Sequence, residues 1–218
     1  MRLRRIVPRL TMTVSVAAPA VISCWSCKGP VAARALFCSV CGAVQGPGDI
    51  DHFTRLGLGP GYDVDLDALD RQYFGFQRRL HPDRFAAKSS REKAFSQQQA
   101  TALNDAYETL KDPLKRAAYL LRLAGKPVDL NSSATISDPV LLMEQMEKRE
   151  AIAEAADVAE IGALIAEAEA EVAGCQKDLS AAFAANRQGE AAQLAVRLKY
   201  LLKLVEDARS RKVRMAGR

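Results

Sequence analysis

The sequence contains few aromatic residues, few histidines and no long uncharged apolar run. Aromatic residues make up 6% of its 218 residues, which favours helices packed through alanine and leucine over a β-sandwich. Only two histidines are present, which argues against enzymes that need several imidazoles. Charged residues interrupt every apolar stretch before it reaches the roughly 18 residues that a membrane span requires. The pattern GxxxxGKS/T is also absent, so the sequence shows no P-loop nucleotide site.

The excess positive charge is concentrated at the N-terminus. The chain carries 31 basic and 26 acidic residues, a net charge of +5. Four of these charges come from Arg2, Arg4, Arg5 and Arg9, which no acidic residue accompanies. The rest of the chain is nearly neutral, which argues against nucleic-acid binding by its body.

Four of the five cysteines form two CxxC pairs. The pairs are Cys24–Cys27 and Cys38–Cys41, with ten residues between them. Four thiolates at this spacing can surround one Zn²⁺ ion tetrahedrally, so the sequence predicts a structural zinc site. Two disulfides, an iron–sulfur cluster or a redox dithiol are the alternatives. Cys175 lies in an alanine-rich run and is predicted to be a small buried side chain.

Apolar residues recur every three or four positions on both sides of a His-Pro-Asp tripeptide. A helix is expected from Asp63 or Asp65 to His81, because Pro82 disfavours a helical conformation in the residue before it. Ser89 can cap a second helix. The sequence therefore predicts two antiparallel helices joined by a short polar loop.

Further helices are predicted downstream. Asp112-Pro113 begins a helix that Gly125 ends. From Ser137-Asp138-Pro139 to about residue 214, three more helices are expected, with breaks near 156–157 and 186–189. A small helical bundle is the natural packing arrangement for such segments.

The loop sequence His81-Pro82-Asp83 is surrounded by positive charge. From Arg71 to Arg91 the chain has six basic residues and one acidic residue, Asp83. An unbalanced basic face attracts an acidic protein surface. On charge alone, the alternative is an ordinary turn beside a solvated helix face.

This tripeptide belongs to an ordered series of motifs. Tyr73 precedes it and Asn104-Asp-Ala-Tyr107 follows it, an arrangement that resembles a DnaJ-type J domain. Over about residues 50–210 the series resembles the HscB family of iron–sulfur co-chaperones. The motifs that carry this resemblance are Phe53–Leu58, His81–Phe85, Leu110–Leu121, Leu142–Glu150 and Leu198–Leu201.

The resemblance implies an all-α co-chaperone rather than an enzyme. Its J domain is expected to stimulate ATP hydrolysis by a heat-shock chaperone of the seventy-kilodalton class. The resemblance implies that His81, Pro82 and Asp83 contact the chaperone and stimulate it, with Arg78 and Arg79 on the adjoining basic face. The expected division is an N-terminal extension at 1–20, a tetracysteine zinc-binding segment at 21–46, a J domain at 50–127 and a C-terminal helical bundle at 137–214. The polar residues 128–136 are expected to form a linker between the last two.

The C-terminal bundle of this family is similar in binding the iron–sulfur scaffold protein. The resemblance places that interface at Leu142, Met143, Met146, Glu147, Glu150 and Tyr200. Tyr200 lies about 200° around its helix from Leu198 and Leu202, off the leucine stripe, as an interface anchor would. For 142–146, core packing is the alternative, and periodicity favours neither. No nucleic-acid or membrane partner is expected, and a homodimer stays open.

Other functions share some of these motifs. A general J-domain protein and a zinc-ribbon interaction protein are the alternatives for the whole chain. A dithiol redox enzyme would need an exposed thiolate of low pKa. A nucleic-acid-binding zinc ribbon is disfavoured, because Lys28 and Arg34 are the only basic residues of the cysteine segment and no run of aromatics accompanies them.

The expected compartment depends on the N-terminus. Many bacterial members of the family begin almost at the J domain, whereas the tetracysteine segment resembles that of animal mitochondrial members. The alanine- and arginine-rich composition favours a bacterial cytoplasmic protein, with the mitochondrial matrix as the alternative. The arginine-rich start is interpreted as a transit peptide, as residues upstream of a true start at Met12, or as a lipoprotein signal ending at Cys24.

Overall fold

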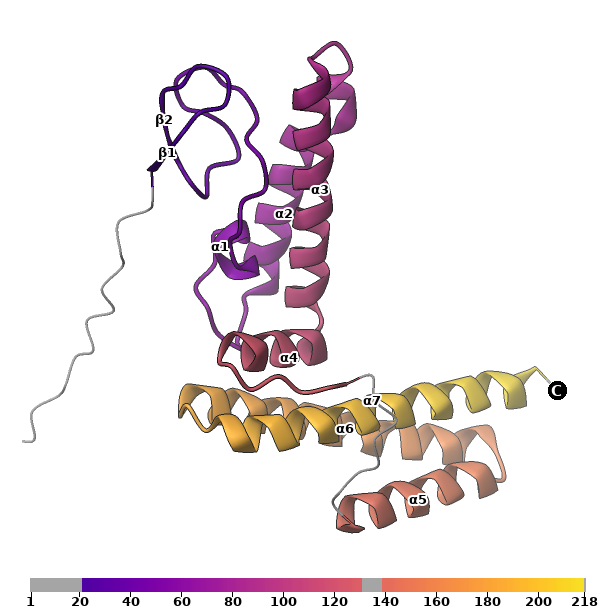
Figure 1. The fold of residues 1–218 in the computed structure, drawn as a ribbon. Helices are drawn as coiled ribbons and strands as arrows, with labels where there is room; N and C mark the ends of the chain where they lie inside the picture. The colour runs from indigo at the N-terminus through magenta and orange to yellow at the C-terminus, as the bar shows by residue number, and fades with distance from the viewer. Residues whose placement is uncertain (1–20, 131–138, 218) are drawn as a thin grey trace, which may run out of the picture.

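The structure, a computed structural model, describes residues 21–130 and 139–217. It is built from helices, with one small antiparallel sheet in its N-terminal part (Figure 1). The predicted all-α class is thereby confirmed. The elements are β1 (Val21–Ser23), β2 (Pro30–Ala32), α1 (His52–Leu56), α2 (Leu66–Leu80), the 3₁₀ helix η1 (Pro82–Phe85), α3 (Ser90–Lys111), α4 (Pro113–Leu123), α5 (Pro139–Glu154), α6 (Val158–Ala184) and α7 (Gln188–Ala216).

Three sequence-based expectations fall outside the described residues. They concern the arginine-rich start, most of the 128–136 linker, and the Ser137-Asp138 helix start. Among the described residues, no helix combines the length and the apolar character that crossing a membrane requires.

Helices α2 and α3 form the predicted antiparallel hairpin (Figure 1). The side chain of Asp65 caps α2 by accepting a hydrogen bond from the backbone N of Ala68 at 3.0 Å. Ser89 caps α3 in a reciprocal capping box with Glu92. Helix α2 ends at Leu80, as expected from the proline two residues later.

The loop between these helices is more ordered than the sequence predicts. Pro82 opens the one-turn helix η1, because its ring fixes the φ angle that a first helical position needs. Phe85, at the other end of this turn, is buried in the hairpin core. The tripeptide is therefore held between the end of α2 and a buried aromatic anchor.

The hairpin core follows the predicted apolar face, with one exception. Leu69, Leu80, Leu103 and Leu110 are buried together. Leu66 has the spacing of this face, but it is the first residue of α2 and is 46% exposed. Burial on α2 begins one turn later.

Helices α5, α6 and α7 form the predicted three-helix bundle, with breaks at the expected positions. The long α6 and α7 pack closely because alanines such as Ala182, Ala191 and Ala195 line their seam. Cys175 is buried in the same cluster, as predicted, and burial raises the pKa of its thiol to about 11. Helix α5 lies on the side of the α6–α7 pair away from the hairpin (Figure 1).

The hairpin and the bundle meet at an elbow formed by α4 and α7 (Figure 1). Ala117 and Leu121 of α4 share one buried cluster with α6 and α7. Tyr62, which precedes α2, stacks on Phe183 of α6 with ring centroids 5.4 Å apart. The guanidinium of Arg116 on α4 also lies over the Tyr62 ring, 5.0 Å from its centre. The elbow is thus a packed apolar junction that joins the two arms.

Candidate functional sites

The His81-Pro82-Asp83 tripeptide is exposed at the end of the hairpin. All three side chains lie at the surface, and that of Asp83 is 90% exposed. The Nδ1 atom of His81 accepts a hydrogen bond from the backbone N of Asp83 at 3.3 Å. The same ring nitrogen lies 3.5 Å from a carboxylate oxygen of Asp83. These local contacts orient the tripeptide while leaving it accessible to a partner.

The basic face beside the tripeptide is formed by the last turn of α2. Arg78 and Arg79 are both exposed there. The guanidinium of Arg79 lies 4.6 Å above the ring of Phe37, a residue of the tetracysteine segment. This cation–π contact orients an otherwise flexible side chain. Sequence reasoning missed it, because nothing local to either residue indicates the other.

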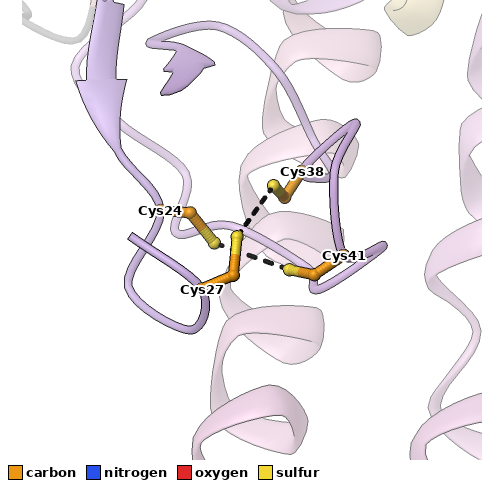
Figure 2. Close-up of side chains that lie close together, drawn as sticks. All are labelled: Cys24, Cys27, Cys38 and Cys41. Carbon is orange, nitrogen blue, oxygen red and sulfur yellow. Dashed lines mark hydrogen bonds between the residues drawn. The ribbon is translucent and has the colours of Figure 1, made fainter. Parts of the chain in front are cut away.

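The four predicted ligand cysteines come together in space. Their sulfur atoms all lie within 4.8 Å of one another. The Sγ atoms of Cys24 and Cys41 are 3.8 Å apart, and so are those of Cys27 and Cys38 (Figure 2). A tetrahedral site with Zn–S bonds near 2.3 Å has sulfur–sulfur edges of about 3.8 Å. The tetrad therefore fits a metal ion of this kind.

The same distances argue against two disulfides. A disulfide bond is about 2.0 Å long, far shorter than the sulfur separations in the tetrad, and all four thiols are free. The alternating burial also suits a shared ion, since Cys24 and Cys38 face inwards and Cys27 and Cys41 face solvent.

The backbone around the tetrad forms two similar knuckles. The residue after each CxxC pair has a left-handed conformation, with φ of 63° at Lys28 and 73° at Gly42. Each knuckle directs a backbone N–H at a cysteine sulfur, from Ser26 to Cys24 and from Val40 to Cys38, both at 3.4 Å. A glycine, as at position 42, is a sequence signal for such a turn. Lys28 gives no such signal, because lysine rarely adopts a positive φ.

The electrostatics of Cys24 favour the form that binds metals. Burial acts to raise the pKa of this thiol. Hydrogen bonds from the backbone of Cys27 and Ser26 and from the side chains of Cys38 and Cys41 outweigh it and lower the pKa to about 6, whereas the pKa of Cys27 is raised to about 11. The side-chain amide of Gln45 also lies 3.5 Å from the sulfur as a donor. A thiolate, rather than a thiol, is the metal ligand.

The tetracysteine segment is fastened to the hairpin by polar contacts. The amide of Gln99 on α3 donates to the carbonyl oxygens of Gln45 at 3.0 Å and Gly46 at 2.9 Å. Arg55 of α1 donates to the carbonyl oxygen of Pro47 at 3.0 Å. Trp25 packs edge-on against Phe95 of α3, with ring centroids 5.9 Å apart. The segment and the hairpin are therefore in direct contact.

The apolar residues predicted at the scaffold interface lie on the surface of α5. Met143 and Met146 are each 63% exposed, and Leu142 is also exposed. Glu147 and Glu150 are exposed as well. The core-packing alternative therefore does not hold for the three apolar side chains.

The opposite face of α5 packs on the bundle. Leu141, Gln145 and Ile152 are the buried residues of this helix. Ion pairs hold the helix to its neighbours, with Arg197 of α7 at 3.0 Å from Glu144 and Lys148 paired with Glu171 of α6. The sequence did not indicate which face of α5 is buried.

Tyr200 lies on α7, between the buried Leu198 and Leu201 in sequence. Leu198 and Leu201 are buried, whereas Tyr200 is half-buried. The amino group of Lys199 lies 5.3 Å from the centre of the Tyr200 ring. Tyr200 is therefore less buried than Leu198 and Leu201, and its place in an interface stays a prediction. The structure places Tyr200 on a different helix from Leu142 and Met143.

Two family models match the chain in order. A DnaJ domain matches residues 51–119, and the HSCB C-terminal oligomerisation domain matches residues 137–209. An iron–sulfur cluster co-chaperone protein HscB homolog from Arabidopsis thaliana is 34% identical over 185 residues, which cover 84% of this chain and 72% of that protein.

Solved structures of HscB proteins are similar to the whole arrangement. The human co-chaperone protein HscB matches with a TM-score of 0.80 and 32% identity, covering 88% of this chain and 98% of the human one. The chaperone HscB from Vibrio cholerae matches with a TM-score of 0.68 and 34% identity, covering 76% and 99%. Residues after Ile50 make up about three quarters of this chain, so the human match extends into the tetracysteine segment. These matches confirm the resemblance inferred from the motifs, and the chain belongs to the HscB family of iron–sulfur cluster co-chaperones.

Proposed function

We propose that this protein stimulates ATP hydrolysis by a seventy-kilodalton-class heat-shock chaperone and delivers an iron–sulfur scaffold protein to it. The observation that carries the proposal is the exposed His81-Pro82-Asp83 tripeptide beside Arg78 and Arg79 on a rigid hairpin. A docking protein of this kind accelerates hydrolysis only if it binds better to the partner conformation closer to the transition state. The tripeptide, oriented in advance by η1, suits such a contact.

The first experiment measures steady-state ATP turnover by the chaperone from the same organism. The wild-type protein should stimulate turnover, and His81→Gln should abolish the stimulation. Lys177→Gln, which changes an exposed side chain on α6, is the matched control and should stimulate like wild type. Equal stimulation by the wild type and His81→Gln would overturn the proposal.

Scaffold delivery is assigned to the exposed face of α5. An apolar surface of Leu142, Met143 and Met146, bordered by Glu147 and Glu150, has the composition of a protein interface with an apolar centre and a charged rim. Tyr200 of α7 is assigned to the same interface. Large apolar patches on a soluble protein commonly mark a binding surface.

Calorimetric titration with the iron–sulfur scaffold protein tests this assignment. Leu142→Ala with Met143→Ala should weaken binding at least tenfold, because central apolar contacts often contribute about 2 kcal/mol or more. Val213→Ala removes another exposed apolar side chain, on α7, and should bind like wild type. Unchanged affinity in the double variant would exclude this face. A general J-domain protein would bind no scaffold in any form.

We assign the tetrad of Cys24, Cys27, Cys38 and Cys41 to a structural zinc ion. Four sulfur ligands complete a tetrahedron, and such a closed site stabilises a fold rather than activating water. Native mass spectrometry should find one zinc per chain, and alkylation of these thiols should require prior chelation. Rapid alkylation of the untreated protein would favour the dithiol alternative.

We retain the division at 21–46, 50–127 and 137–214, and a bacterial cytoplasmic location with the mitochondrial matrix as the alternative. Sequencing the mature N-terminus by mass spectrometry separates these locations. A start at residue 1 or at Met12 favours the cytoplasm, whereas cleavage between Met12 and the first cysteine favours import. Light scattering at working concentration tests the homodimer.

A further inference from the structure

A cleft of about 750 Å³ lies where the tetracysteine segment meets α1 and α2. The segment supplies one wall, which includes Arg34, Leu36 and Phe37. The helices supply the other, which includes Arg55 and Arg79. The proposed function assigns no role to this cleft. One of its lining residues, Arg79, also belongs to the basic face beside the tripeptide.

The charge of the cleft is entirely positive. Arg34, Arg55 and Arg79 all line it, and none of its lining residues is acidic. Within the described residues, none of these arginines forms an ion pair with a carboxylate. Arginines without a paired carboxylate attract a carboxylate-bearing partner.

Arg55 is a buried residue that contributes one of these positive charges. Its side chain is only 7% exposed. The hydrogen-bond partners of its guanidinium are the carbonyl oxygens of Pro47 and Gly48 and the side-chain oxygen of Gln99, all of them neutral. Burial lowers the pKa of Arg55, and the charges of Asp105 and Asp51 act to raise it. An arginine stays protonated in proteins, so Arg55 adds a positive charge to the wall of the cleft.

The remaining lining is apolar. Leu36, Phe37, Leu58 and Phe76 are half-buried side chains that line the cleft between the arginines. A concave site of mixed arginine and aromatic character binds a segment that combines carboxylates with an apolar side chain. Such a segment would satisfy both parts of the lining.

We propose that this cleft binds an acidic segment of the partner chaperone that carries an apolar anchor. The proposal rests on the proposed function for the identity of that partner. Arg79 belongs both to the cleft and to the basic face next to the tripeptide, so one partner can cover the two surfaces continuously. The scaffold is assigned to α5, on the far side of the bundle (Figure 1), and is therefore the less suitable occupant.

This assignment gives the tetracysteine segment a role in docking. Phe37 precedes the ligand Cys38 in sequence, and its ring lies beneath the Arg79 guanidinium. The wall containing Arg34 and Phe37 is therefore positioned by the metal-binding fold. The interface with the chaperone extends from the hairpin onto this wall.

The affinity of the chaperone for full-length variants tests the proposal. Arg34→Glu should weaken binding roughly fivefold to tenfold and flatten its salt dependence, because it reverses a charge at the edge of the interface. Arg34→Lys should restore most of the affinity. Lys126→Glu reverses a charge at an exposed position after α4 and should bind like wild type. Each variant must retain wild-type metal content and melting temperature.

The outcomes separate this proposal from the proposed function. If His81→Gln abolishes stimulation while Arg34→Glu binds like wild type, the cleft is not part of the interface and the proposal fails alone. If wild type does not stimulate the chaperone at all, the proposed function fails first.

A photo-crosslinker replacing Arg34 identifies the occupant directly. It should react with an acidic segment of the chaperone, which peptide mapping would reveal. Reaction with the scaffold instead, or with a segment lacking acidic residues, would overturn the proposal even if affinities change.

Discussion

The tetracysteine segment and the C-terminal bundle are folded by different forces. The segment's own buried cluster consists of Cys24, Val31 and Cys38, with Ala35 against it, while its Val44 is buried in the hairpin core. The bundle buries long rows of leucine, isoleucine and alanine along α6 and α7. A segment of some 25 residues buries little apolar surface of its own. The zinc ion proposed for the tetrad would therefore supply much of its stability. From this comparison we expect metal removal to affect the segment and core cavities to affect the helices, each without the other.

Removing the metal should have the largest effect, and only on the segment. Structural zinc typically contributes about 10–16 kcal/mol of apparent binding free energy, so chelation should unfold residues 21–46. Trp25, the only tryptophan of the chain, donates a hydrogen bond to the carbonyl of Val44 and packs on Phe95. Its fluorescence should shift to the red while the far-ultraviolet circular dichroism of the helices stays nearly constant. A cooperative loss of helicity would contradict the separation.

A cavity in the bundle should have the next largest effect. Leu198 is fully buried on α7, so Leu198→Ala should lower the free energy of unfolding by about 2–5 kcal/mol. Leu142→Ala, at an exposed position of α5, should change it by less than about 0.5 kcal/mol. Urea denaturation followed by circular dichroism measures both. Similar losses in the two variants would mean that α5 is more deeply packed than described.

Loss of one helix cap should have a smaller effect. Ser89 accepts a hydrogen bond from the backbone N of Glu92 at 3.3 Å, and Ser89→Ala should cost about 1 kcal/mol. Ser90→Ala, at the first helical position, should cost almost nothing. The effect should appear in urea denaturation of the hairpin and leave the metal content unchanged. Equal costs at the two serines would contradict the capping role.

The smallest expected effect concerns pH. Burial lowers the pKa of His52 below its usual 6.5, although Asp105 acts to raise it. The unfolded chain therefore takes up this proton at a higher pH than the folded one. Stability should therefore fall as the pH drops below about 6.5. His52→Gln should lose this part of the pH dependence in thermal unfolding, whereas His81→Gln, at an exposed site, should keep it.

The sequence predicts those parts of the fold that depend on neighbours along the chain. Asp65, one of two candidates, and Ser89 cap their helices as expected, because a cap bonds to backbone groups within three residues. The helix predicted to begin at Asp112-Pro113 is also found, with Asp112 as its cap. The CxxC spacing likewise identifies the metal ligands, since each knuckle is a local turn. Family membership followed from short motifs of the same kind.

Contacts between distant segments could not be predicted in this way. Gln99 binds the carbonyl of Gln45 across 54 positions, and neither residue has an unusual local pattern. On α5, Gln145 is buried whereas Met146 is exposed, the reverse of what polarity indicates. The packing of α6 and α7 decides the buried face of α5, and periodicity within α5 does not report it.

The packed elbow has a consequence for the way two partners could share this protein. Ala117 and Leu121 fasten the hairpin to α6 and α7 through a buried cluster, independently of the chain that links α4 to α5. The hairpin and the bundle are therefore joined by a packed interface as well as by the connecting chain. If the scaffold protein binds α5 and the chaperone binds the hairpin, as proposed above, this junction holds the two partners at a fixed distance and orientation.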